Sequence, residues 1–113
     1  MNELTRRLAT LDLQPALDCA EIRDFVVLFA NRLRLRLLCH LSQGRACVRE
    51  LVEATGEKQS NVSQQLKLLH EADLVRRQRV GARVYYDIGN PVAVEVTDFL
   101  RAAAARPRHS NRR

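Results

Sequence analysis

Polar side chains gather in the segment from residue 59 to residue 71. On a helix of 3.6 residues per turn, Val62, Leu66 and Leu69 fall on one side of this segment. The positions that we take as DNA-binding carry amides, hydroxyls and one lysine: Gln59, Ser60, Asn61, Ser63, Gln64 and Lys67. Such groups approach base edges and phosphates closely, and amides both donate and accept hydrogen bonds. The segment therefore predicts a helix that enters the DNA major groove; a solvated polar face is the alternative.

A group of arginines without an acid follows this segment: Arg76, Arg77, Arg79 and Arg83. They lie on two extended runs, 75–80 and 83–88, and the Gly81-Ala82 pair between the runs predicts a β-hairpin. A hairpin that is merely soluble would be expected to carry charges of both signs. A cationic hairpin is suited to DNA phosphates or the minor groove. We therefore take Arg77, Arg79 and Arg83 as DNA-binding residues.

The composition fits a small DNA-binding domain. The chain has 113 residues, enough for one domain, and 46% of them are hydrophobic, enough for a core. Nineteen basic residues face 13 acidic ones, which gives a net charge of +6 and favours a polyanionic partner. No apolar run could span a membrane and no secretory signal is visible, which predicts a cytoplasmic protein. No set of nucleophile, base and orienting group can be assembled, so we expect no enzyme.

The remaining segments predict the helices that position these residues. Apolar periodicity favours helices at about residues 19–30 and from the capping residue Asn31 toward Gly44, and a short one at about 47–54 that stops at Gly56. Asn90 and Pro91 begin a last helix as its cap and first residue. We expect a short helix in residues 4–13. The domain organisation predicted is an N-terminal extension (1–17), a DNA-binding and dimerisation domain (18–105) and a basic, disordered tail (106–113).

Several segments resemble, in their order, the ArsR/SmtB family of metalloregulatory repressors. They are residues 30–38 (ANRLRLRLL), 47–51 (CVREL), 59–67 (QSNVSQQLK), 71–75 (EADLV) and 81–86 (GARVYY). The resemblance implies a mainly helical winged helix-turn-helix fold with a small β-hairpin. It also implies a homodimer that represses transcription from an inverted-repeat DNA operator and leaves it when an inducer binds. Two positions depart from the family: Arg32 replaces a proline, and Lys58 stands where a small capping residue opens the recognition helix.

The resemblance also suggests how an inducer is sensed. Family members that bind thiophilic metals often carry Cys-Val-Cys-Asp where this chain has residues 47–50 (CVRE). Cys47 and Glu50 share a helix face and could offer sulfur and oxygen ligands to a thiophilic metal or metalloid ion, with Cys19 from the other subunit. The favoured alternative for Cys47 is a core thiol, because free cysteines are among the most buried residues.

A second family mode is redox sensing by a thiol, and Cys39 matches its first cysteine. No cysteine follows Cys47, so the usual pair with the last helix is absent, and a buried thiol is again the alternative. The family's other metal site, on the last helix, has no matching ligands here. From the residues alone, Cys19 is a further candidate for a reactive thiol, because a helix N-terminus favours the thiolate. The competing hypothesis is a thiol-based metal-buffering or redox protein without specific operator binding.

Overall fold

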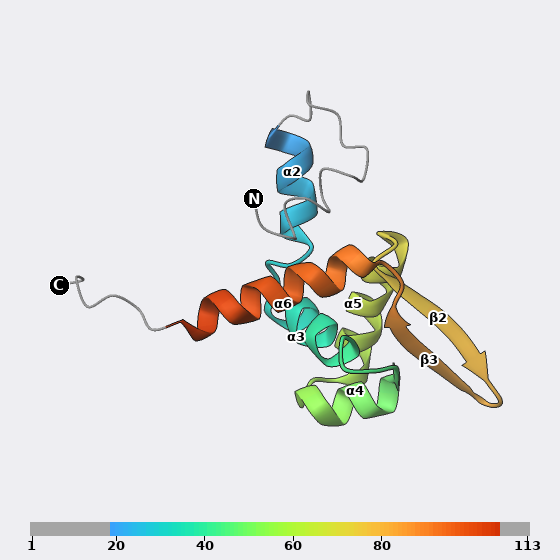
Figure 1. The fold of residues 1–113 in the computed structure, drawn as a ribbon. Coiled ribbons are helices and arrows are strands. Elements are labelled where there is room, and N and C mark those ends of the chain that lie inside the picture. Colours follow the sequence, from blue (N-terminus) through green and yellow to red (C-terminus); the bar gives the residue numbers. More distant parts are fainter. Residues whose placement is uncertain (1–18, 107–113) are drawn as a thin grey trace.

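The structure is a computed structural model that describes residues 19–106 (Figure 1). Its elements are α2 (Cys19–Val27), α3 (Arg32–Leu41), β1 (Ala46–Cys47), α4 (Val48–Thr55), α5 (Gln59–Glu71), β2 (Val75–Val80), β3 (Arg83–Ile88) and α6 (Pro91–Ala105). The expected helix at 4–13, the N-terminal extension and nearly all of the basic tail lie outside the described residues. The order of elements is that of a winged helix-turn-helix fold, in which α4 and α5 form the helix-turn-helix and the β2–β3 hairpin forms the wing.

The core lies between α3, α4 and α5. Leu37 and Leu38 of α3, Leu51 of α4 and Leu66 and Leu69 of α5 are all fully buried. These are the apolar positions that the 3.6-residue period places on the inner side of each helix. Because full burial of a leucine side chain contributes about 1.5–3 kcal/mol, this cluster fixes α5 firmly against α3 and α4.

The helix boundaries follow the capping residues that the sequence indicated. The Asn31 side chain accepts a hydrogen bond from the backbone N–H of Arg34 at 2.9 Å and begins α3. Gly56 ends α4 in the left-handed conformation (φ 74°), and Asn90 caps α6 ahead of Pro91. Lys58 precedes α5 without a side-chain capping bond, because lysine stands here in place of the small capping residue that is usual in the family.

Two boundaries differ from the prediction. The first described helix, α2, ends at Val27 rather than near residue 30, because the next residues turn toward α3. Cys47 belongs to a short strand, β1, and precedes α4 instead of starting it. The sheet accordingly has three strands in the order β1-β3-β2, all antiparallel, where the sequence indicated only a hairpin. A strand of two residues is too short to leave a periodic pattern.

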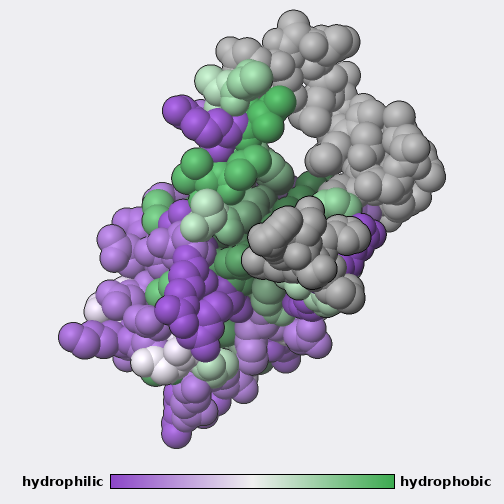
Figure 2. Space-filling view, turned by 90° about the vertical axis from the view of Figure 1, so that its left-hand side faces the viewer, coloured by the Kyte–Doolittle hydropathy of each residue, from purple (hydrophilic) through white to green (hydrophobic). Residues whose placement is uncertain are grey.

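Large apolar side chains remain exposed on α2 and on the C-terminal half of α6. Ile22 and Val26 of α2 are 50% and 54% exposed, and Phe99 and Leu100 of α6 are 46% and 40% exposed. Figure 2 views the molecule from the side. Apolar side chains gather in the upper and middle part of this view, and most of the lower part is hydrophilic. Within residues 19–106, no helix is both long enough and apolar enough to cross a membrane.

Candidate nucleic-acid interface

The polar side chains of α5 face outward, as the sequence predicts. Val62, Leu66 and Leu69 have no solvent exposure, which fixes the rotation of the helix about its axis. Every residue chosen as a DNA contact on α5 is exposed: Gln59, Ser60, Asn61, Ser63, Gln64 and Lys67. Ser60, Ser63, Gln64 and Lys67 recur at helical spacing and therefore form one continuous outer face, with Gln59 and Asn61 on its flanks. A convex helix with this surface can insert into the major groove.

Arg34 links α5 to the rest of the fold through three hydrogen bonds. Its Nε donates to the carbonyl of Leu28 at 3.0 Å, and one terminal nitrogen donates to the carbonyl of Val27 at 3.1 Å. The other terminal nitrogen donates to Oε1 of Gln65 on α5 at 2.7 Å. One half-buried guanidinium thus ties the end of α2 to α5. A charged residue just after a helix cap is the only sequence signal for this role, because its partners are distant in the chain.

The register of the wing divides the predicted arginines between its two faces. Residues opposite each other in an antiparallel pair project on the same face, and successive residues alternate. Val75 stands opposite Ile88, Arg77 opposite Tyr86 and Arg79 opposite Val84. Arg77 and Arg79 therefore project on the same face of the hairpin as Val75. Val75 is buried in the core, whereas Arg77 and Arg79 are both exposed.

Arg83 lies on the other face of the wing. It stands opposite Val80 and lines a small cavity of about 220 Å³ with Cys47, Val48 and Arg49. Sequence reasoning grouped the three arginines together, and the structure brings only Arg77 and Arg79 onto one face.

Arg76, the first arginine of the cluster, is paired with an acid from the opposite strand. Its Nε and one terminal nitrogen donate to the two carboxylate oxygens of Asp87, at 3.1 and 2.9 Å. The hydrogen bonds from this guanidinium to Asp87 raise the pKa of Arg76 above its ordinary value. Because Asp87 neutralises Arg76 in place, the free positive charge of the wing lies on Arg77, Arg79 and Arg83.

Cys47 and Glu50, two of the predicted metal ligands, contact each other at the start of α4 through a hydrogen bond that caps the helix. Oε1 of Glu50 accepts a hydrogen bond from the backbone N–H of Cys47 at 2.9 Å, and this bond is the main cause that lowers the pKa of Glu50. Cys47 itself is 5% exposed. Cys19 begins α2, and Figure 1 shows α2 and α4 at opposite ends of the molecule. Within residues 19–106 no three His, Cys, Asp or Glu side chains are grouped to hold a metal ion.

Cys39 is more accessible than Cys47. Its side chain is half-buried on α3 and lines a cavity of about 460 Å³. The walls of this cavity include His40, Thr55 of α4 and Arg101 of α6, so the cavity lies where three helices meet. A small reagent can therefore reach this thiol without the core opening.

Comparison with known proteins identifies relatives of the chain. A family model for bacterial regulatory proteins of the ArsR family matches residues 31–77. A transcriptional repressor from Synechocystis sp., named as an SmtB homolog, is 37% identical over 91 residues, which cover 76% of this chain and 69% of that protein. The family match runs from the cap of α3 into the wing and so includes the whole helix-turn-helix.

Two solved structures share the fold. The AntR antimony-specific transcriptional repressor superposes with a TM-score of 0.68 at 32% identity, covering 84% of this chain and 89% of its own. The homodimeric winged helix-turn-helix DNA-binding domain of Mb0332 from Mycobacterium bovis has a TM-score of 0.65 at 28% identity, covering 80% and 90%.

Proposed function

Because this chain belongs to the ArsR family of bacterial regulatory proteins and is a transcriptional repressor of that family, we propose that it binds an inverted-repeat DNA operator as a homodimer. The observation that carries this proposal is the outer face of α5. The face is exposed and is made of groups suited to base edges and phosphates. Arg77 and Arg79 extend from the same side of the hairpin as the helical core and supply contacts to phosphates that do not depend on sequence.

The exposed apolar residues of α2 and α6 support the homodimer. A monomeric protein rarely leaves a cluster of large apolar side chains in water, and a second copy would cover Ile22, Val26, Phe99 and Leu100. The Mb0332 domain, a solved relative, is homodimeric. Two-fold symmetry then places the two α5 helices in successive major grooves, with half-sites about one helical turn apart.

Replacement of Gln64 by alanine is expected to change the preferred base at one position of each half-site. Gln64 lies on the exposed outer face of α5, and loss of a base contact costs about 1–3 kcal/mol at the base pair concerned. Selection from a randomised operator library, read by sequencing, measures this change. Gln43→Ala removes an exposed glutamine that lies outside α5, in the turn after α3, and serves as the control. An unchanged preference in Gln64→Ala would show that this residue does not read bases.

We further propose that an inducer acts at the accessible cysteines, Cys19 and Cys39. The solved AntR relative is antimony-specific, and thiols are the ligands that soft metals and metalloids prefer. Cys19 is exposed, and Cys39 is half-buried beside the larger cavity of about 460 Å³, whereas only 5% of Cys47 is exposed. The inducer is therefore a thiophilic ion or a thiol-reactive compound that leaves Cys47 intact.

The serine variants of the three cysteines are expected to behave differently. Operator release is measured against arsenite, cadmium, hydrogen peroxide and a polysulfide. Release by at least one agent should be lost in Cys19→Ser or Cys39→Ser and kept in Cys47→Ser, because the buried thiol does not meet the agent. If all three variants respond as the parent does, sensing by cysteine is wrong. If the parent takes up metal or cycles a disulfide without binding an operator, the protein is instead a thiol-based buffer.

A further inference from the structure

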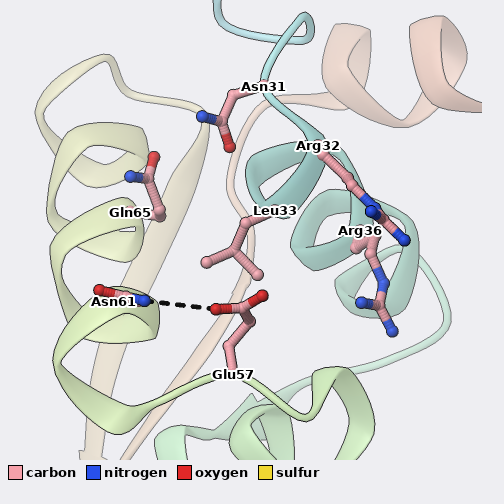
Figure 3. Close-up of a pocket in the computed structure, with 7 residues that line it drawn as sticks. All are labelled: Asn31, Arg32, Leu33, Arg36, Glu57, Asn61 and Gln65. Atoms are coloured by element: carbon pink, nitrogen blue, oxygen red, sulfur yellow. Dashed lines mark hydrogen bonds between the residues drawn. The ribbon is translucent and has the colours of Figure 1, made fainter.

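A cleft separates the flank of α5 from the start of α3 and the α4–α5 turn (Figure 3). Its volume is about 300 Å³, and it combines apolar, amide and charged side chains. The residues that line it are Asn31, Arg32, Leu33, Arg36, Glu57, Asn61 and Gln65. Asn61 belongs both to this cleft and to the exposed surface that we assign to DNA.

Glu57 determines which way the Asn61 amide points. The Nδ2 of Asn61 donates to Oε1 of Glu57 at 3.3 Å. A carboxylate has only acceptor atoms, so the atom of Asn61 that it contacts must be the amide nitrogen, and the reverse orientation would bring two acceptors together. In Figure 3 the Asn61 nitrogen points into the cleft toward Glu57, and its oxygen points away from the cleft. Asn61 therefore presents a hydrogen-bond acceptor to whatever lies beside α5.

The backbone that carries Asn61 is held in place next to this contact. Gln65, one helical turn farther along α5, accepts the 2.7 Å hydrogen bond from Arg34. Val62, between the two amides, is fully buried. Glu57 is itself half-buried, and its backbone N–H donates to Oγ1 of the buried Thr55 at 3.3 Å. Both partners of the Glu57–Asn61 contact thus stand on positions that the core fixes.

We propose that Glu57 is a specificity-determining residue that acts through Asn61, by making it an acceptor for an exocyclic amino group. In the major groove, adenine N6 and cytosine N4 are amino donors, whereas guanine O6 and thymine O4 are acceptors. Asn61 held by Glu57 selects adenine or cytosine at the position it faces. Without Glu57 the amide turns over and accommodates either class of base. This inference rests on the proposed function, because it requires α5 to lie in the major groove.

The test uses the base preference of the full-length protein on an operator library. Asn61→Ala identifies the base pair concerned, where the preference for adenine or cytosine over guanine or thymine should fall by about tenfold. Glu57→Gln should lose the preference at that same base pair, because the new amide can donate or accept. The double variant Glu57→Gln with Asn61→Asp should regain it: the introduced amide donates to one oxygen of the introduced carboxylate, and the other oxygen accepts from the base. This double variant keeps the formal charge of the parent.

Glu53→Gln is the matched control, since it makes the same charge change on α4, where the partner is Arg49 at 3.8 Å. It should leave the base preference unchanged. Affinity for unrelated DNA, measured in parallel, shows that each variant is folded. The proposal is overturned if Glu57→Gln retains the parent's preference at the base pair that Asn61→Ala alters, if Asn61→Ala alters none, or if the double variant does not restore it. A parent protein that shows no sequence preference at all would instead refute the proposed function.

Discussion

Replacement of Phe99 by glutamate is expected to dissociate the dimer and to lower operator affinity by at least about a hundredfold. Phe99 is 46% exposed on α6, beside Leu100, and the proposed interface covers both. A carboxylate there would be buried without a partner, which costs several kcal/mol. The separated protomers would bind half-sites one at a time and lose the gain of two linked contacts, which is about 10²–10⁴ in affinity. Val26→Glu on α2 should have the same effect.

Sedimentation measures the oligomeric state, and gel shifts on full and half operators measure the affinity. The control for the oligomeric state is Leu68→Glu, which places the same charge on an apolar side chain that is 43% exposed on α5, outside the proposed interface. This variant should stay dimeric. If Phe99→Glu and Val26→Glu also remained dimeric, the assignment of the interface to α2 and α6 would be refuted.

Removal of both wing arginines, Arg77→Ala with Arg79→Ala, should weaken binding to every DNA sequence by at least about tenfold. A homodimer loses four cations in this variant. Each phosphate contact contributes about 0.9 to the slope of log affinity against log salt concentration, so the slope should fall by about three to four. The order of preference among operator sequences should stay as in the parent, because phosphate contacts carry no base information. Salt titrations on specific and unrelated DNA measure both effects.

The structure supplies a matched control in the same hairpin. The double variant Arg76→Ala with Asp87→Ala removes a neighbouring arginine together with its partner, so the net charge does not change. The salt dependence of this control should remain close to that of the parent. If the control lost affinity and slope as much as the Arg77/Arg79 variant does, general damage to the wing, rather than lost phosphate contacts, would explain the result.

Local sequence signals predicted most of the fold correctly. Asn31, Gly56 and the Asn90-Pro91 pair act on backbone groups within a few residues, so their effects can be seen in the chain itself. The two-residue strand β1 was missed because its pairing with β3 depends on residues about 40 positions away. The role of Arg34 was missed for the same reason, since Gln65 lies 31 residues farther along the chain.

The sequence by itself determined the kind of protein this is. The helical period of α5 separates its buried residues from its polar ones, and this period is a local property of the chain. Only the tertiary structure decided which of the charged and polar groups are free to act. The hairpin register places Asp87 against Arg76 and sends Arg83 to the other face from Arg77 and Arg79. In the cleft beside α5, Glu57 accepts a hydrogen bond from Asn61 and so fixes the direction of the Asn61 amide. The first of these contacts depends on how the strands pair and the second on the conformation of the turn before α5, because side-chain hydrogen bonds and ion pairs form only between groups that folding brings within about 3–4 Å.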